Sequence, residues 1–272
     1  MTLNTRFELR NKLGEGSMSE VFAAFDRNLQ RPVAIKLLKG FDRGGIYEEM
    51  RQRFLVDARA AARITHPNVV TVYDAGHFGA GVAIVMELAK DTLRKMLNRT
   101  PQLPLDTVSN ITAQIADGLK CLHGFGIFHR DIKPSNILLA AGGVPKIGDF
   151  GLAHLPASDL TRSGTVIGTP KYMSPEQAQG QDLDYRTDIF SLGVVVFEML
   201  TGRTPFGLPP AEDHVLLGRI ISDPVLKPSQ LNPGVAAGFD VIVARALAKN
   251  PQDRYQDAGE MAAALRNYKT LA

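Results

Sequence analysis

The chain has 272 residues, which suits one large domain or two small lobes. Hydrophobic residues make up 44% and charged residues 22%, so the composition allows a packed core and excludes wholesale disorder. The net charge of +3 is too balanced for a dedicated nucleic-acid binder, and we expect no nucleic-acid partner.

Compartment can also be argued from composition. Cys121 is the single cysteine, which excludes an intramolecular disulfide. The N-terminus lacks the apolar segment of a signal peptide. The most apolar run, 189–200, is interrupted by polar residues and is far shorter than the ~20 residues that span a bilayer. We therefore expect no membrane segment in this chain and a cytoplasmic location, with the intracellular domain of a longer membrane-anchored protein as the alternative.

The first part of the chain has the pattern of short strands around one helix. A glycine-rich turn separates the first two predicted strands, and Gly76, Gly79 and Gly81 predict a loop between the last two. A stretch from about 47 to 63, rich in Ala, Arg and Glu, predicts a helix. The predicted strands cover 7–9, 20–25, 32–38, 69–73 and 82–86.

From residue 91 onward the pattern becomes mostly helical. Breaks between helices are predicted at Pro209-Pro210 and at Asn232-Pro233. A strand-rich front and a helix-rich back predict two lobes, residues 1–86 and 87–272, with a ligand cleft between them. The predicted helices cover about 105–124, 174–179, 186–201, 211–222, 235–248 and 257–269.

Two short motifs indicate the chemistry. Residues 129–136 read His-Arg-Asp-Ile-Lys-Pro-Ser-Asn, which places Asp131 five positions before Asn136. Residues 149–151 read Asp-Phe-Gly and add a second acid. Phosphoryl transfer needs metal ions on the phosphates and an acceptor for the proton of the incoming hydroxyl, and these residue types supply both. Here the chain resembles the protein kinase family, whose catalytic and magnesium loops have these letters at this spacing.

The resemblance covers 7–268 and is greatest to the bacterial eukaryotic-like (Hanks-type) Ser/Thr kinases. It implies an α+β, bilobal protein kinase fold, with a small antiparallel β-sheet N-lobe that carries one large helix and a mainly helical C-lobe. It also implies transfer of the ATP γ-phosphoryl group to Ser/Thr hydroxyls of protein substrates, the chain itself included. The implied cofactors are ATP and Mg2+, with Mn2+ as an alternative ion, and a dimer would permit autophosphorylation in trans.

The resemblance also implies roles for the loop residues. Asp131 would orient the substrate hydroxyl and accept its proton, and Lys133 would neutralise charge on the transferring phosphoryl group. Asn136 and Asp149 would hold the metal ion. Lys133 is typical of kinases that modify Ser or Thr. His129 is expected to be structural.

A glycine-rich hairpin at 13–21 is suited to phosphate binding, because glycine lets the backbone approach a ligand closely. Ser19 stands where the family pattern has a third glycine. By this resemblance, Met86 would close the back of the adenine pocket. Glu87 and Ala89 lie in the segment that links the two lobes, the hinge, and would offer backbone hydrogen bonds to the nucleotide. The implied nucleotide site comprises Leu13, Gly14, Gly16, Val21, Ala34, Lys36, Met86, Glu87, Ala89 and Leu138.

Lys36 stands at the strand position where kinases place the lysine that holds the phosphates. An acid on the first large helix pairs with that lysine in the family, and the matching position holds Asp57 in place of glutamate. This side chain is shorter by one carbon–carbon bond, about 1.5 Å. Either the helix lies closer to the sheet, or Asp57 is solvated and basal activity is low.

The resemblance assigns the remaining polar residues to regulation and support. Arg130 would receive a phosphate on the activation segment, and three hydroxyls of that segment are candidates for modification: Thr165, Ser163 and Thr161. Glu176 would pair with Arg254, and Asp188 would accept backbone N–H groups of the catalytic loop.

Two rival functions remain. A pseudokinase that works as a scaffold is favoured by Asp57 but disfavoured by the retained residues Lys36, Asp131, Asn136 and Asp149. A small-molecule kinase of the aminoglycoside type shares an acid and an asparagine at similar spacing. Kinases of that type lack the Gly-Thr and Ser-Pro-Glu segments, present here at 168–169 and 174–176, that dock a peptide.

Overall fold

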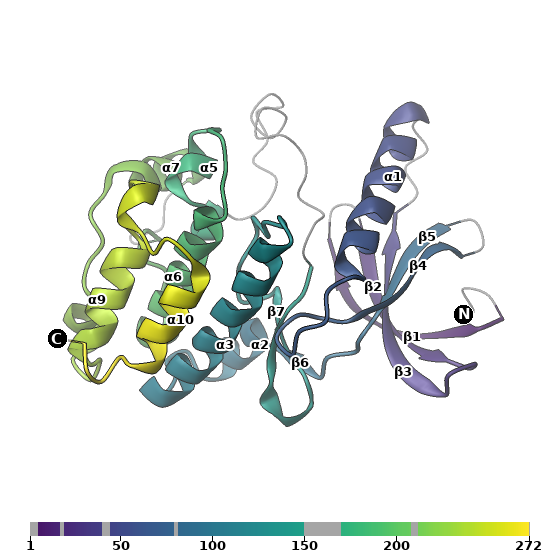
Figure 1. Cartoon of the computed structure of the whole chain (residues 1–272), viewed down its shortest axis with the longest axis horizontal. Coiled ribbons are helices and arrows are strands. Elements are labelled where there is room, and N and C mark those ends of the chain that lie inside the picture. The colour runs from purple at the N-terminus through teal and green to yellow at the C-terminus, as the bar shows by residue number, and fades with distance from the viewer. Residues whose placement is uncertain are drawn as a thin grey trace.

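The computed structural model describes residues 5–16, 19–39, 44–78, 81–149, 170–207 and 212–271. In the first helix, the side chains at positions 44–47, 49, 50, 53 and 57 lie outside this description. The described chain forms two lobes, one built on a β-sheet and the other almost entirely helical (Figure 1). This confirms the predicted bilobal α+β fold.

A five-stranded antiparallel sheet forms the N-terminal lobe, with the strand order β1-β2-β3-β5-β4. Side chains alternate between its two faces, as the period of a strand requires. Ala83 and Val85 pack on one face, while Val82 and Ile84 pack on the other against Phe54 of α1. The elements are β1 (Phe7–Glu15), β2 (Ser19–Asp26), β3 (Arg31–Leu38), α1 (Gly44–Ala61), β4 (Val72–Phe78) and β5 (Gly81–Met86).

The strand predicted at 69–73 is wrong in its position along the chain. The observed β4 runs from Val72 to Phe78 and passes through Gly76, where the sequence predicts a loop. Val69 makes only an isolated bridge to Ile147, and both Val69 and Val70 are buried. These valines pack in the core of the helical lobe, so a run of apolar, β-branched residues at this point does not indicate a strand of the sheet.

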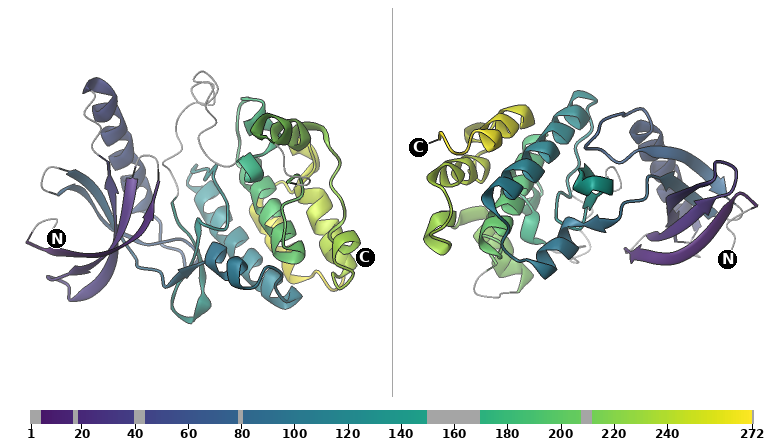
Figure 2. Two further views of the ribbon diagram at one scale, coloured as in Figure 1. Left: turned by 180° about the vertical axis from the view of Figure 1, so that it is seen from behind. Right: turned by 90° about the horizontal axis from the view of Figure 1, so that it is seen from below.

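The second lobe is organised around α6 (Arg186–Thr201), where every residue from Thr187 to Thr201 is buried. A helix that is apolar on all sides belongs in the centre of a bundle, and α3 (Leu105–Gly124) and α9 (Ala237–Ala246) pack beside it (Figure 2). None of the helices in the described part of the chain combines the length and apolar content that a bilayer crossing requires.

The remaining elements of this lobe are short. Its helices and 3-10 turns are α2 (Leu93–Arg99), η1 (Ala141–Gly143), η2 (Pro170–Tyr172), α5 (Pro175–Ala178), α7 (Asp213–Ser222), α8 (Pro228–Leu231), η3 (Pro251–Asp253) and α10 (Ala258–Arg266). A small sheet adds β6 (Asp91–Thr92), β7 (Ile137–Leu139) and β8 (Pro145–Ile147). The sequence did not predict α2 or this sheet, because two- to seven-residue elements are too short for periodicity to register.

The chain between α1 and β4 belongs by its packing to the helical lobe. Ile64, Val69 and Val70 lie in the core of that lobe. The Val70 N–H donates to the Ile147 carbonyl at 2.9 Å, and the Ile147 N–H donates to the Asn68 carbonyl at 2.8 Å. The predicted division at 86/87 therefore stays a prediction, since this earlier segment connects the lobes as well.

Candidate active site

The catalytic-loop motif lies between α3 and β7, and a buried carboxylate of α6 holds its start. Asp188 Oδ1 accepts the backbone N–H of Arg130 at 2.7 Å, and Oδ2 accepts that of His129 at 2.8 Å. Arg130 has φ +64°, a left-handed conformation that is uncommon for residues other than glycine. Backbone of this kind persists where its surroundings over-determine it, and Asp188 supplies two of the necessary hydrogen bonds.

His129 is buried, and both of its ring nitrogens bind backbone groups. Nε2 donates to the Gly148 carbonyl at 2.9 Å, and Nδ1 accepts the N–H of Asp131 at 3.2 Å. Because a carbonyl can only accept and an N–H can only donate, the neutral Nε2–H tautomer satisfies both contacts. This geometry supports the structural role expected for His129.

Asp131, Lys133 and Asn136 meet at the end of the loop. Lys133 Nζ lies 2.7 Å from Asp131 Oδ2, and Asn136 Nδ2 donates to the same oxygen at 2.9 Å and to the Asp131 carbonyl at 2.8 Å. The Asp131 side chain is 44% exposed, so a substrate can reach it. Both side-chain partners use Oδ2, and Asp131 Oδ1 has no hydrogen-bond partner among the described residues.

Asp149 follows β8 and connects the two lobes electrostatically. Lys36, a buried side chain of β3, forms an ion pair with Asp149 Oδ1. Desolvation would raise the pKa of the Asp149 carboxyl, but the charge and hydrogen bond of Lys36 outweigh it, and the pKa lies below its usual range. Asp149 has φ +63°, a second left-handed residue at the site. The sequence assigned Asp149 to a metal ion and did not predict this pair.

Several predicted site residues lie outside the described part of the chain. These are the side chain of Asp57, Phe150 and Gly151 of the second motif, and the candidate phosphorylation sites Thr161, Ser163 and Thr165. The pairing of Asp57 with Lys36 and the modification of the segment stay predictions. Arg130 is the predicted receptor of the activation-segment phosphate. Its guanidinium carbon lies 6.0 Å from the centre of the Phe128 ring.

Asn136 and Asp149 each have a side-chain oxygen of the type that a hard divalent cation prefers. Asn136 uses Nδ2 for its two acceptors, which turns Oδ1 away from them, and Asp149 Oδ2 also has no hydrogen-bond partner among the described residues. Across the same described residues, no group of three or more His, Cys, Asp or Glu side chains could hold a metal. Mg2+ typically takes one or two protein oxygens and completes its shell with waters and substrate phosphates, so this donor set fits it.

The predicted nucleotide site is divided between the lobes. Ala34 of β3 pairs with Met86 of β5, which places this buried residue next to the start of the hinge. The Gly16 N–H donates to the Ser19 carbonyl at 2.8 Å and closes the glycine-rich hairpin, on which Leu13 is exposed and Gly14 has open space around its Cα. In the other lobe, Leu138 of β7 packs so closely on Gly148 that a Cβ there would lie 2.8 Å from Leu138 Cδ1.

The hinge leaves backbone groups available. The Glu87 N–H donates to the Thr71 carbonyl at 2.9 Å, and the Glu87 carboxylate pairs with Lys146 at 3.0 Å. The Glu87 carbonyl, and both backbone polar groups of Ala89, have no hydrogen-bond partner among the described residues. Adjacent unpaired backbone donors and acceptors at the edge of an apolar slot can bind a planar heterocycle.

The predicted pair of Glu176 and Arg254 forms and is connected to the catalytic loop through α5. Glu176 of α5 and Arg254 form a buried ion pair, and Thr187 Oγ1 donates to Glu176 Oε1 at 2.7 Å. Gln177 Nε2 donates to the Arg130 carbonyl at 2.8 Å, which ties α5 to the catalytic loop. The sequence did not predict this last contact, because it joins segments 47 positions apart without a motif of its own.

The family profile described as "Protein kinase domain" matches residues 7–264. The chain belongs to the protein kinase family. It is 40% identical over 272 residues to the serine/threonine-protein kinase PknB of Mycobacterium leprae, covering 97% of this chain and 43% of PknB. It is 39% identical over 265 residues to PknL of Mycobacterium tuberculosis, covering 97% of this chain and 65% of PknL.

The fold has a solved counterpart. The crystal structure of a point mutant of the Mycobacterium tuberculosis PknI kinase domain matches with a TM-score of 0.72 and 27% identity, covering 97% of this chain and 96% of that one. These similarities confirm the family and the bacterial Ser/Thr kinase resemblance predicted from the motifs. The chain spans about two fifths of the length of PknB, so the activity of the whole protein is a separate question.

Proposed function

We propose that this kinase domain transfers the γ-phosphoryl group of ATP to Ser or Thr hydroxyls of protein substrates. The observation that carries the proposal is that Asp131, Lys133 and Asn136 meet on one loop. The Asn136 carbonyl accepts the N–H of Gly148 at 2.9 Å, and Gly148 directly precedes Asp149, the partner of Lys36. The Ser/Thr preference rests on Lys133 and on the similarity to serine/threonine-protein kinases that are about 40% identical over nearly the whole chain.

In the proposed reaction, Asp131 Oδ1 accepts the hydrogen bond of the substrate hydroxyl and orients its oxygen toward the phosphoryl group. Lys133 and Asn136 hold the other carboxylate oxygen, so the carboxylate does not rotate freely. Lys133 also adds positive charge beside the transferring group, where negative charge must be stabilised. Asp131 takes the hydroxyl proton as the hydroxyl oxygen bonds to the γ-phosphorus, while the bond from that phosphorus to the β,γ-bridging oxygen breaks and ADP leaves.

Nucleotide binding is assigned to the cleft. Val21 and Ala34 from above and Leu138 from below would enclose the adenine ring, and Glu87 and Ala89 would bind its edge through backbone groups. Lys36 would orient the phosphates. Asn136 and Asp149 would hold a divalent ion, Mg2+ or alternatively Mn2+, which neutralises phosphate charge when bound. The two-lobe division, the cytoplasmic location, the lack of a nucleic-acid partner and a dimer for trans-autophosphorylation stay predictions.

The test uses labelled ATP, a divalent ion and a generic protein substrate, followed by phosphoamino-acid analysis. Wild-type protein should give phosphoserine or phosphothreonine. Asp131→Asn should abolish transfer while leaving the nucleotide Kd nearly unchanged, because the acid contacts the hydroxyl and not the nucleotide. Asp182→Asn, the same change at an exposed position, should behave as wild type. Nucleotide binding without any transfer by the wild-type protein would support the pseudokinase alternative instead.

A further inference from the structure

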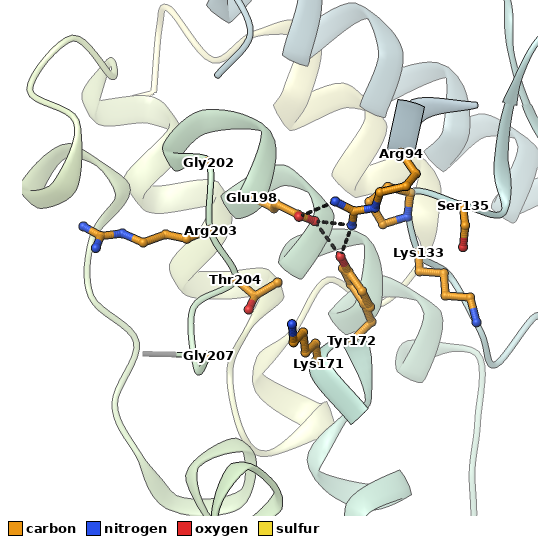
Figure 3. A pocket seen from close by; sticks show the side chains of 11 residues that line it. Arg94, Lys133, Ser135, Lys171, Tyr172, Glu198, Gly202, Arg203, Thr204 and Gly207 are labelled. Atoms are coloured by element: carbon orange, nitrogen blue, oxygen red, sulfur yellow. Dashed lines mark hydrogen bonds and ion pairs between the residues drawn. The ribbon is translucent and has the colours of Figure 1, made fainter. Parts of the chain in front are cut away.

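A cavity of about 620 Å³ opens on the helical lobe beside the catalytic loop (Figure 3). Its volume lies in the range of ligand-binding pockets. Its walls come from α2, the catalytic loop, η2, the end of α6 and the loop that follows α6. Its described lining residues include four cationic side chains and a single acidic one: Arg94, Lys133, Lys171, Arg203 and Glu198.

Among the described residues of the lining, Glu198 is the only acid, and both of its carboxylate oxygens already accept hydrogen bonds. Glu198 Oε1 accepts Arg94 Nη1 at 2.9 Å, while Oε2 accepts Arg94 Nη2 at 3.2 Å and the Tyr172 hydroxyl at 2.7 Å. Burial, and then the charge of Glu198, raise the pKa of Tyr172, so the hydroxyl keeps the proton that it donates. A basic side chain entering the cavity would therefore find no free carboxylate oxygen among the lining residues that the structure describes.

In contrast to Glu198, two of the cationic side chains have no ion-pair partner among the described residues. Lys171 and Arg203 are exposed, and neither has an ion-pair partner among the residues that the structure describes. In Figure 3, Lys171 points toward Thr204, and the Arg203 side chain extends away from Glu198 and Tyr172. Lys133 shares its charge with Asp131 outside the cavity. Among the described lining residues, the charge that is not neutralised by an ion pair is thus positive.

The cavity shares one residue, Lys133, with the transfer site. Lys133 lines it, and the Nζ atom of the same residue lies 2.7 Å from Asp131 Oδ2. An extended polypeptide advances about 3.3 Å per residue. A substrate that presents its hydroxyl to Asp131 therefore passes the cavity within a few residues of that hydroxyl.

We propose that this cavity selects protein substrates that carry an anionic side chain, a carboxylate or a phosphate ester, within a few residues of the modified hydroxyl. The inference rests on the proposed kinase function and assigns specificity to Lys171 and Arg203. Two exposed charge pairs correspond to about three- to tenfold in kcat/KM. A phosphate carries about −1.5 to −2 charges and should be preferred over a single carboxylate.

The experiment uses positional-scanning peptide libraries with a central Ser or Thr. One flanking position at a time holds Gln, Glu, phosphoserine or Lys, and the other positions are degenerate. For wild type we expect at least one position where Glu exceeds Gln by about three- to tenfold in kcat/KM. That ratio should fall toward one as the salt concentration rises, because screening weakens exposed charge pairs. The phosphoserine arm separates phosphate from carboxylate selection.

The variants assign the effect to the cavity. The double variant Lys171→Glu/Arg203→Glu should lose the Glu preference, or reverse it in favour of Lys, while the Gln peptides are phosphorylated as before. The matched control is Lys95→Glu, an exposed lysine of α2 next to Arg94 that does not line the cavity, and it should keep the wild-type ratio.

The possible failures are distinguishable. Efficient phosphorylation of Gln peptides with no Glu or phosphoserine preference at any position would overturn the anion selectivity and leave the kinase function intact. A preference that Lys95→Glu removes as well as the double variant does would place the effect outside the cavity and overturn the assignment. Absence of transfer to every peptide and to the protein itself would overturn the kinase function.

Discussion

The Glu176 carboxylate and the Arg254 guanidinium form a two-point ion pair in the protein interior, with Nη1–Oε1 at 2.7 Å and Nη2–Oε2 at 2.8 Å. Arg254 also donates to the carbonyls of Ala248 and Lys249, and its guanidinium lies 4.9 Å from the centre of the Phe190 ring. A further bond from Arg254 Nη1 to the Arg186 carbonyl at 3.1 Å uses the last of the five guanidinium N–H groups. These bonds hold α5 to the chain that precedes α10.

Loss of either member of this pair should destabilise the domain. Arg254→Ala leaves a buried carboxylate unpaired, and we expect the free energy of unfolding to fall by about 3–5 kcal/mol in urea denaturation. Arg27→Ala, which removes an exposed ion pair with Glu8 at 3.0 Å, should cost about 1 kcal/mol or less. Equal effects of the two substitutions would contradict the structural role of the buried pair.

Lys249 should make stability depend on alkaline pH. Its Nζ donates to the Ile220 carbonyl at 2.7 Å and lies 4.1 Å from the centre of the Phe206 ring. Burial lowers the pKa of Lys249 to about 8 from 10.5. Between these values the unfolded chain binds the proton and the folded chain releases it, so stability rises with pH through this window.

The measurement is the urea midpoint of wild type and of Lys249→Met from pH 7 to pH 10.5. Relative to the variant, which cannot titrate at this position, wild type should gain stability as the pH rises from about 8, the folded-state pKa of Lys249. Other titrating groups are common to both proteins and cancel in the difference. Parallel curves across the whole range would show that Lys249 keeps an ordinary pKa.

Substitution of Asp57 tests whether this residue pairs with Lys36 and so supports turnover. If it pairs with Lys36, Asp57→Ala should lower turnover by roughly 10²-fold, because a mispositioned lysine loses electrostatic stabilisation of the transition state. Asp57→Glu should be tolerated. Glu48→Ala, on the same helix and paired with Arg51 at 2.9 Å, serves as the control and should have little effect. Near-wild-type turnover of both Asp57 variants would favour a solvated Asp57.

Autophosphorylation is expected in the segment 161–165, chiefly at Thr165. A phosphate there would add charge-assisted contacts with Arg130 and raise activity. Mass spectrometry after incubation with ATP and Mg2+ locates the modification, and Thr165→Ala should then be less active than wild type. Thr100→Ala, at an exposed hydroxyl after α2, is the control. A fully active Thr165→Ala protein would count against this switch, with Ser163 and Thr161 as the remaining sites.

Much of the fold follows from local pattern. The helices at 105–124 and 186–201 have the predicted boundaries, because long apolar repeats report the backbone period directly. The β4 register escaped prediction, since the valines at 69–70 owe their apolar character to the other lobe. Pattern shows that a residue is buried, but it does not show against which element the residue packs.

The sequence by itself determined the family and the residue types of the site, because the acid–amide spacing of 131–136 and the motif at 149–151 are local. Only the tertiary structure decided that Lys36 pairs with Asp149, 113 positions away. The same holds for Arg94, which donates hydrogen bonds to both carboxylate oxygens of Glu198, 104 positions away. Such partners are chosen by how the lobes and helices pack. A side chain buried with its charge takes the counter-charge that packing brings within reach, and no local period encodes that distance.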